Sequence, residues 1–444
     1  MLKTFPKGGI HSPENKITAD KETVTLPIPK QVIIPVSQHI GAPAKVIVKK
    51  NDKVKTGQMI AQSNGFVSAC IHSSVSGTVF KVDNIPDAGG YKRLAVVINV
   101  EGDEWLDNID RSEDIIKEIN SDKNEILKKI QDAGVVGLGG ATFPTHVKLL
   151  PPKSMKPEVL IINGAECEPY LTADHRLMLE KSEELLIGIK ILMKALSVNK
   201  AVIGIENNKS DAINKLETLS ENYDNISVAA LKTKYPQGGE KQLIKAVTGK
   251  EVPSGELPVK VGAVVQNVGT VFAVYEAVQK NKPLIDRIVT VTGKYLSNPG
   301  NFKVRIGTSV KELINTAGGL PENTGKIISG GPMMGRALIT DNTGITKGTS
   351  GILILSEQES KRRSLKPCIR CAKCVEVCPM GLEPFFLMAL SRKTLFEKTE
   401  NEGIFDCIEC GSCSYICPSD RPLLDFIRLS KKEVALIRKA KRIK

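Results

Sequence analysis

The chain has 444 residues, of which 41% are hydrophobic and 25% are charged. This is the composition of globular protein, and the length predicts about three domains rather than one. Disorder and low-complexity sequence are excluded for most of the chain, and no apolar run approaches the roughly 20 residues that cross a bilayer. The net charge of +13, with 4% aromatic residues and no nucleic-acid-binding motif, makes RNA and DNA the least favoured partners. The N-terminus carries no charged segment followed by an apolar core, so we expect no signal peptide and a cytosolic chain.

Residues 1–105 are predicted to contain a small β-module. The stretches VIVKKNDKVKTGQMIAQ and SSVSGTVFKV, both within residues 41–82, resemble the two halves of a barrel-sandwich module of the biotinyl/lipoyl type. Carrier modules of that type present a modifiable lysine on the turn between the halves. No lysine occurs between Lys55 and Lys81, so we expect this module to be structural or a docking face rather than a carrier.

Residues 106–280 are predicted to form an α/β domain. We expect a helix from Ser112 to Ala133, followed by the glycine-rich loop GLGGATFPTHVK at residues 137–148. Strands and helices then alternate, which favours a parallel sheet covered by helices. The expected strands are 159–163, 201–206 and 226–231, and the expected helices are 172–196, 211–220 and 240–247.

Polar residues and glycines collect where two of these strands end, in the sequences NGAECEP and YPQGGE. In parallel sheets, ligands lie in the crevice beyond the carboxyl ends of the strands. We therefore expect a cofactor at this edge, although each acid taken singly is more often a solvated loop carboxylate. Cys167, within NGAECEP, is expected to line the pocket or to pack.

Residues 281–358 are predicted to form a small domain. Its first part, residues 286–331, has two strands, a helix and a Gly-Gly turn. This pattern resembles the β-grasp (SLBB-like) domain.

Residues 359–430 hold eight of the ten cysteines, in two groups with C-x2-C-x2-C-x3-C-P spacing. This is the pattern of bacterial two-cluster ferredoxins, in which the fourth thiolate of each group ligates the other cluster. A pair of zinc sites is the alternative. The segment 381–406 between the groups is predicted to be helical, and residues 431–444 are expected to form a solvated basic tail, with a membrane or partner contact as the alternative. The predicted [4Fe–4S] quartets are Cys368, Cys371, Cys374 and Cys417, and Cys407, Cys410, Cys413 and Cys378.

The ordered series GLGGATFPTHVK, NGAECEP, YPQGGE and QNVGT resembles the flavoprotein subunit of respiratory complex I. That family binds FMN and NADH in one Rossmann-like domain. The resemblance implies that Glu166, Glu168 and Glu240 accept hydrogen bonds from nicotinamide or ribose. Two positions depart from the family pattern, since Leu138 replaces an arginine and Gly239-Glu240 replaces an acidic pair. The residues implied to bind FMN or the dinucleotide are Gly137, Gly139, Gly140, Lys148, Asn163, Tyr235, Gly238, Asn267 and Thr270.

The order of the parts, together with GGIHSPENK at residues 8–16, resembles the C subunit of Rnf complexes, which are ion-translocating ferredoxin:NAD+ oxidoreductases. The resemblance implies an α/β multidomain protein with a barrel-sandwich module, a Rossmann-like FMN/NADH domain, an SLBB-like domain and a two-cluster ferredoxin-like domain. It further implies hydride exchange between NAD(H) and non-covalent FMN, and single-electron transfer through two [4Fe–4S] clusters. The expected partners are NAD(H), the other, membrane-embedded subunits and, indirectly, ferredoxin, with the chain peripheral on the cytoplasmic side of the cell membrane.

Two other functions stay open on the sequence. A soluble flavin/iron–sulfur corrin reductase is similar through the flavin and cluster domains but starts near the glycine-loop helix, so the first 100 residues here argue against it. A flavin-free iron–sulfur relay scaffold would carry the clusters without a working NADH site.

Overall fold

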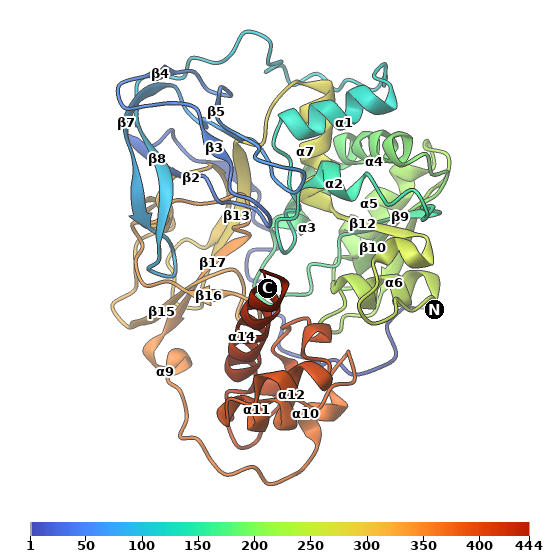
Figure 1. Ribbon diagram of the computed structural model, residues 1–444. Coiled ribbons are helices and arrows are strands. Elements are labelled where there is room, and N and C mark those ends of the chain that lie inside the picture. The colour runs from blue at the N-terminus through green and yellow to red at the C-terminus, as the bar shows by residue number, and fades with distance from the viewer. Residues whose placement is uncertain (1, 444) are drawn as a thin grey trace.

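The computed structural model describes residues 2–443 and has the predicted α/β multidomain architecture. Figure 1 shows two β-rich parts on one side, a helix-covered sheet on the other, and the cysteine-bearing helices below them. The chain passes between these parts in sequence order, except that its first 25 residues run along all but the barrel-sandwich module.

The N-terminal module consists of two small antiparallel sheets facing each other. One contains β2 (Gln31–Pro35), β8 (Lys92–Val100), β7 (Gly77–Pro86) and β4 (Lys53–Val54); the other contains β3 (Lys45–Val46), β5 (Met59–Gln62) and β6 (Ile71–His72). In β2 the buried Val32 and Ile34 alternate with residues that face outward, which is the period of a half-buried strand. They pack on Ile60, Ile71 and Ile98 from the other strands, so the predicted barrel-sandwich module is confirmed.

A parallel four-stranded sheet forms the centre of the second part. Its order is β11 (Ile226–Leu231), β10 (Ala201–Glu206), β9 (Val159–Asn163) and β12 (Ala263–Asn267). The predicted strands 159–163, 201–206 and 226–231 are confirmed. Such strands are apolar along their whole length because helices cover both faces of the sheet. The helices are α1 (Lys123–Asp132), α2 (Thr145–Lys148), α3 (Ala173–Glu180), α4 (Ser182–Leu196), α5 (Ser210–Ser220), α6 (Glu240–Thr248) and α7 (Val268–Gln279), with a 3-10 turn at Pro258–Val261.

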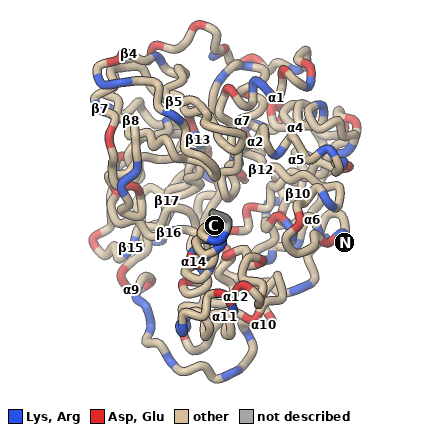
Figure 2. Tube along the Cα trace, viewed as in Figure 1, with Lys and Arg blue, Asp and Glu red and all other residues tan. Residues whose placement is uncertain are grey.

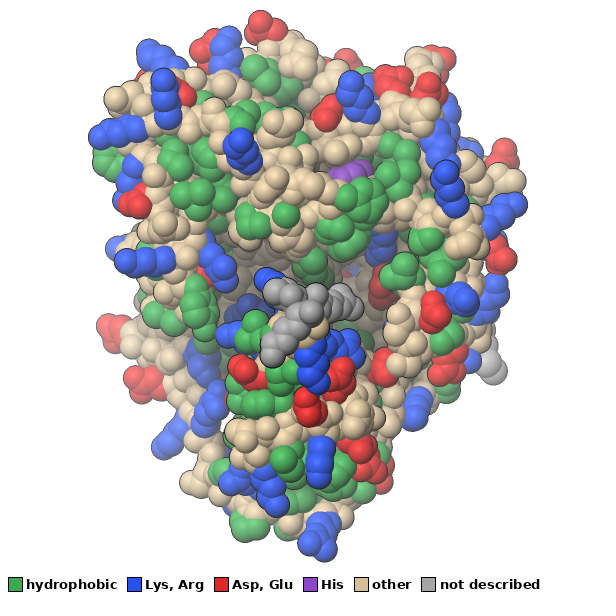
Figure 3. Space-filling view, in the orientation of Figure 1, with side chains coloured by type: hydrophobic (Ala, Val, Ile, Leu, Met, Phe, Trp, Pro, Cys, Tyr) green, Lys and Arg blue, Asp and Glu red, His purple; other side chains and the backbone are tan. Residues whose placement is uncertain are grey.

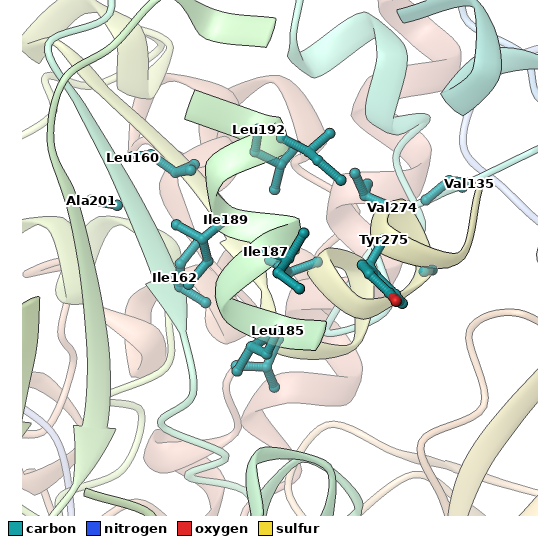
Figure 4. Packing of buried hydrophobic residues seen from close by; sticks show 14 of the residues in the cluster. Val135, Leu160, Ile162, Leu185, Ile187, Ile189, Leu192, Ala201, Val274 and Tyr275 are labelled. Atoms are coloured by element: carbon teal, nitrogen blue, oxygen red, sulfur yellow. The ribbon is translucent and has the colours of Figure 1, made fainter. Parts of the chain in front are cut away.

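Alternate residues of β9 supply two cores. Leu160 and Ile162 pack with α4 and α7 (Figure 4), whereas Ile161 packs with Leu243 and Ile244 of α6. The sheet is therefore held from both sides, and its carboxyl edge is left to carry the polar loops.

The helix predicted from Ser112 is wrong in its first half, since α1 begins only at Lys123. The backbone before it is bound by side chains of α7: Ile116 N–H donates to the Tyr275 hydroxyl at 3.0 Å, and Gln279 donates to the Ile116 carbonyl at 2.9 Å. Asp122 then accepts from the N–H groups of Asn124 and Glu125 and starts the helix. The helix predicted over 172–196 is two helices that meet at Lys181.

A mixed six-stranded sheet forms the third part. Its order is β1 (Thr23–Thr25), β14 (Gly300–Arg305), β13 (Asp286–Thr292), β17 (Gly351–Ser356), β15 (Thr324–Ser329) and β16 (Arg336–Ala337), with α8 (Val310–Thr316) and α9 (Glu357–Ser360) beside it. The predicted two strands, helix and Gly-Gly turn are present. The edge strand β1 comes from the N-terminal segment, which thereby ties the start of the chain to this domain.

The cysteine-bearing part is helical. It contains α10 (Lys373–Glu376), α11 (Pro384–Arg392), α12 (Phe396–Asn401), a 3-10 turn at Ile404–Asp406, α13 (Ser412–Tyr415) and α14 (Leu423–Ile443). The segment between the cysteine groups is helical as predicted, but it forms two helices because Thr394 has a left-handed backbone, with φ of 55°.

The tail from residue 431 belongs to a helix, because α14 runs unbroken from Leu423 to Ile443. Residues 435–441 are mostly exposed, whereas Val434 is buried. Leu423, Ile427, Ser430 and Val434 are all buried, and their spacing of four, three and four residues places them on one helix face. Val434 packs with Leu387 and Met388 of α11. The stripe crosses the predicted domain boundary, so the last residues viewed alone did not reveal it.

Replacing Val434 by alanine is expected to destabilise the cysteine-bearing part by about 2 kcal/mol, because a fully buried side chain leaves a cavity. The measurement is urea denaturation of the reconstituted chain, followed through the cluster absorbance. Leu436→Ala is the matched control in the same helix, since Leu436 is 52% exposed. Equal losses in the two variants would contradict the docking of α14.

Candidate functional site

The order of the parallel sheet reverses between β9 and β12, and the two strands end in register at Asn163 and Asn267. Beyond such a switch point the loops on the two sides separate and leave a crevice for a ligand. Figure 3 shows the face of the molecule hollowed between the β-rich side and the parallel α/β side.

The glycine-rich loop is fixed above this crevice. Leu138 donates its N–H to the Thr270 hydroxyl at 2.9 Å, and the buried Arg287 donates to the Leu138 carbonyl at 2.7 Å. A Cβ on Gly139 would lie 2.7 Å from the Asn267 amide nitrogen, so only glycine fits there.

The far end of the loop is open. No heavy atom lies within 4 Å of the position that a Cβ on Gly140 would take. Within residues 2–443, the N–H groups of Gly139 and Gly140 have no acceptor. Free backbone donors at the edge of a glycine loop are suited to the phosphate of a nucleotide. These residues therefore fit FMN.

Asn163, Gly238 and Asn267 meet below the loop. The Asn163 amide donates to the Gly238 carbonyl at 2.9 Å, and Asn267 accepts from the Gly269 N–H at 2.9 Å, which caps α7. Lys148 pairs with Glu240 at 2.6 Å, and both side chains are partly exposed. The structure thus brings Gly139, Lys148, Asn163, Gly238, Glu240, Asn267 and Thr270 to one edge.

The other two predicted glutamates are held by the chain itself. Glu166 accepts from the N–H groups of Asp174 and His175 at 2.8 and 3.1 Å, and so caps α3. Glu168 accepts from the N–H groups of Met333 and Met334 at 2.7 and 2.9 Å. Burial raises the pKa of the Glu168 carboxyl, and those two N–H groups oppose the rise. Neither is a solvated loop carboxylate.

Asp174 was not predicted from the sequence. It accepts from the Asn267 amide at 2.7 Å, and burial with the nearby charge of Glu166 raises its pKa to about 7. An aspartate in the first turn of a helix is ordinary, so nothing in the local pattern distinguished it.

Lys16, the last residue of GGIHSPENK, crosses to the same loop. Its ammonium donates to the carbonyls of Glu166, Glu168 and Leu171 at 2.7, 2.9 and 2.6 Å. Burial, with the positive charge of Lys209 nearby, lowers its pKa to about 8. The motif indicated this residue, but only the fold shows what it holds.

The same segment, residues 8–16, reaches the cysteine-bearing part. Gly9 donates its N–H to the Val377 carbonyl at 2.9 Å, next to Cys378, and Ile10 pairs with Tyr235 through both backbone groups. We call residues 8–16 the strap. It contacts the sheet edge, the glutamate loop and a cysteine group.

Tyr235 differs from its expected role. Its hydroxyl donates to the Cys410 carbonyl at 2.7 Å and therefore points to a cysteine loop rather than to a cofactor at the glycine loop. Cys167 accepts from the Gly238 N–H at 3.2 Å and lines a pocket together with Lys16 and Glu206. Burial raises the pKa of the Cys167 thiol.

Cysteines of the two motifs lie next to each other. Cys378, Cys407, Cys410 and Cys413, here the inner quartet, line one apolar pocket. Burial raises the pKa of Cys413, and the charges of Cys410, Cys407 and Cys378 add to this. In the other group, here the outer quartet, burial raises the pKa of Cys374, and the charges of Cys417 and Cys368 contribute. Cys378 thus lies with the three cysteines of the second motif, and Cys417 lies near Cys374 of the first; the assignment of the complete quartets to two clusters stays a prediction.

The two cysteine loops have the same backbone. Arg370 and Ala372 in the first loop have φ of 55° and 59°, and Glu409 and Gly411 at the matching positions of the second have 57° and 79°. Four thiols around one apolar pocket are the ligand set of a cubane.

Four family models match the chain in the predicted order. They are the RnfC barrel sandwich hybrid domain over residues 3–103, the Nuo51 FMN-binding domain over 130–276, the SLBB domain over 288–337 and the 4Fe-4S dicluster domain over 360–418. The matches support FMN and two iron–sulfur clusters, and they favour clusters over the zinc pair. The domain bounds of 105, 280, 358 and 430 stay predictions.

Two curated relatives match nearly end to end. The C subunit of the proton-translocating ferredoxin:NAD(+) oxidoreductase complex of Clostridium ljungdahlii is 50% identical over 98% of this chain and 94% of its own. The C subunit of the Na(+)-translocating ferredoxin:NAD(+) oxidoreductase complex of Acetobacterium woodii is 46% identical over 96% of each.

The chain belongs to the Rnf C-subunit family.

A solved structure extends the likeness at the level of the fold. An NAD+-reducing [NiFe]-hydrogenase in the H2-reduced state matches with a TM-score of 0.51 at 18% identity, over 72% of this Rnf protein and 67% of that chain. Within residues 2–443 no helix is long and apolar enough to cross a bilayer.

Lys16→Met is expected to loosen the glutamate loop of this Rnf protein, because three carbonyls lose a charged donor. A loss of about 2 kcal/mol of local stability corresponds to roughly 30-fold faster amide exchange. Hydrogen–deuterium exchange of residues 166–171 measures it. Lys21→Met, at an exposed lysine of the same N-terminal segment, is the control. Unchanged exchange in Lys16→Met would refute the anchoring role.

Asp174→Asn is expected to change how stability depends on pH. The folded state holds a proton on Asp174 up to about pH 7, whereas the unfolded state releases it near the ordinary value of 3.8. Stability supplied by this group is therefore present at low pH and is lost as the pH rises from about 4 to about 7. The Tm of the variant should rise relative to wild type across that window. A constant difference would contradict the assignment, with Asp20→Asn, at an exposed aspartate, as the charge control.

Proposed function

We propose that the chain is the electron-transfer subunit of a membrane-bound, ion-translocating ferredoxin:NAD+ oxidoreductase, exchanging hydride with NAD(H) at the glycine loop and single electrons through the cysteine domain. The observation that carries the proposal is the hydrogen bond of 2.7 Å from Tyr235 to the Cys410 carbonyl. It joins the sheet edge that carries the flavin-site residues directly to the inner quartet.

The roles of the site residues follow from their contacts. The free N–H groups of Gly139 and Gly140, with Lys148, would hold the phosphate of FMN, and Gly137 begins the turn that presents them. Asn163, Gly238, Asn267 and Thr270 would line the site below. FMN, when bound, supplies the conversion between the hydride of NAD(H) and single electrons.

The three glutamates divide into two roles. Glu240, 40% exposed beside Lys148, is free to face a nicotinamide or ribose. Glu166 and Glu168 are occupied by backbone N–H groups, so we assign them to positioning. Glu166 positions helix α3, and Glu168 positions the loop at Met333.

The two quartets have different surroundings, and this supports an order. Cys410 and Cys413 are buried, and the loop of the inner quartet touches Tyr235 and Met333, whereas Cys368 and Cys371 of the outer quartet are exposed. Electrons therefore enter or leave the protein at the outer quartet, with the inner quartet on the flavin side.

We further propose that the chain is peripheral and lies on the cytoplasmic side, with the other subunits as its partners. The two relatives are named for different ions, H+ and Na+, although both are nearly full-length matches. Similar C subunits can serve complexes that move different ions if the ion pathway lies in other subunits.

Anaerobic purification, cluster reconstitution and an NADH titration followed by absorption test the function. We expect flavin bands that bleach and about eight irons per chain. Cys371→Ala should lose one cluster and keep flavin bleaching. Clusters without flavin, or flavin indifferent to NADH, would overturn the proposal in favour of a relay scaffold. Loss of bleaching in Cys371→Ala with the fold intact would overturn the order of the quartets.

A further inference from the structure

The linker between α9 and α10 carries an unusual surface. Residues 361–373 contain six lysines or arginines and no acid, and every one of these residues is exposed. We call this segment the cluster-loop face. Figure 2 shows the blue stretches along this loop at the lower end of the molecule.

The face includes two ligands of the outer quartet. Cys368 and Cys371 are exposed, and Ile369 between them is 66% exposed. A redox centre held there is open to a protein that docks on the loop, whereas the inner quartet is enclosed by the rest of the chain.

Acidic residues of the same chain leave most of the positive charge of the face unpaired. Arg362 and Arg363 contact Asp425 and Asp420 at 3.2 and 3.8 Å, yet their side chains stay 78% and 83% exposed. The other four bases form no ion pair with any residue between 2 and 443; they are Lys361, Lys366, Arg370 and Lys373.

The inner loop provides the contrast within the same molecule. At the position that matches Arg370 it carries Glu409, which is neutralised by Arg428 and Lys431 at 3.0 Å each. The same backbone therefore carries a compensated acid where it faces the protein, and uncompensated bases where it faces solvent.

We propose that the cluster-loop face docks an acidic electron-transfer protein and brings its redox centre next to Cys368 and Cys371. Complementary charge steers such encounters and orients them, and electron-transfer interfaces are small enough for one loop to dominate. Ile369 supplies an apolar centre, ringed by the bases. The proposal rests on the proposed function, since it requires the outer quartet to exchange electrons.

An anionic membrane is the less favoured occupant. Surface-binding segments bury a continuous apolar helix face, and this segment is an extended linker whose exposed apolar side chains, Leu365 and Ile369, are isolated. Its backbone is also fixed to the cysteine domain, because Lys366 donates its N–H to Ser419 and Arg421 donates to the Lys366 carbonyl, both at 3.2 Å.

The test is binding of a small acidic two-[4Fe–4S] ferredoxin to the reconstituted, oxidised full chain at increasing NaCl concentration. The variant Lys361→Glu/Lys366→Glu/Arg370→Glu reverses three charges. Arg370→Glu copies the residue that the matching loop tolerates at φ of 57°. We expect the wild-type Kd to rise with salt, and the Kd of the variant to be raised about tenfold or more at low salt.

The matched control is Lys45→Glu/Lys50→Glu/Lys53→Glu, the same charge change at exposed lysines of the barrel-sandwich module. It should raise the Kd less than about threefold. Cytochrome c, a basic redox protein, should bind the charge-reversed chain at least as well as wild type. If iron analysis shows that Arg370→Glu costs a cluster, Lys361→Glu/Lys366→Glu replaces the triple variant, with a smaller rise expected.

An unchanged Kd in the face variant, or an equal rise in the control, would overturn the proposal. Binding of phosphatidylglycerol vesicles that depends on the face, with ferredoxin binding that does not, would overturn it in favour of a membrane. NADH bleaching of the flavin is measured separately on the wild type. Its absence would defeat the proposed function, while the binding of the oxidised chain still reports on the face.

Discussion

The contact on which the arrangement of the redox site depends is the ammonium of Lys16 among the three carbonyls of Glu166, Glu168 and Leu171. Taking a charge out of water is costly, and it is tolerated here because every donor has an acceptor at close range. The loop that these carbonyls belong to leads from β9 to α3, and the strap that carries Lys16 also contacts the Val377 carbonyl and Tyr235. The strap, anchored by Lys16, thus connects the sheet edge to the cysteine domain.

Such fixed contacts suit electron transfer between redox centres, because its rate depends on the distance between the centres. The strap, the Tyr235–Cys410 hydrogen bond and the contact between Glu168 and the Met333 loop all cross domain boundaries. The strap and the Tyr235–Cys410 hydrogen bond join the α/β domain to the cysteine domain, and the Met333 loop, held by Glu168, lies beside Gly411 of the inner loop. Two of the glutamates that resemble cofactor ligands take part in this framework.

The two copies of the cysteine motif have similar backbones but different surroundings. Its two loops share positive φ at matching positions, so their local geometry is nearly symmetric. Their environments are not, because one loop is covered by the flavin-type domain and the other is open. Burial then sets the properties of each quartet, since thiols enclosed by protein lose solvent contact and exposed ones keep it. The charges differ in the same way: Glu409 in the covered loop is paired with Arg428 and Lys431, whereas Arg370 in the open loop forms no ion pair within residues 2–443.

The sequence by itself determined the order of the domains, the strands of the parallel sheet and the grouping of the eight cysteines, because these depend on local period and spacing. It also determined which loops collect at the carboxyl edge, since parallel strands end on one side. It failed where partners come from far along the chain. The backbone before α1 is bound by α7 and so does not form a helix, and α14 extends through the basic tail because Val434 packs on α11. Only the tertiary structure decided that Tyr235 faces a cysteine loop, that Asp174 joins the site, and that Glu166 and Glu168 hold backbone. Those outcomes depend on hydrogen bonds and burial between segments distant in sequence, which no local pattern encodes.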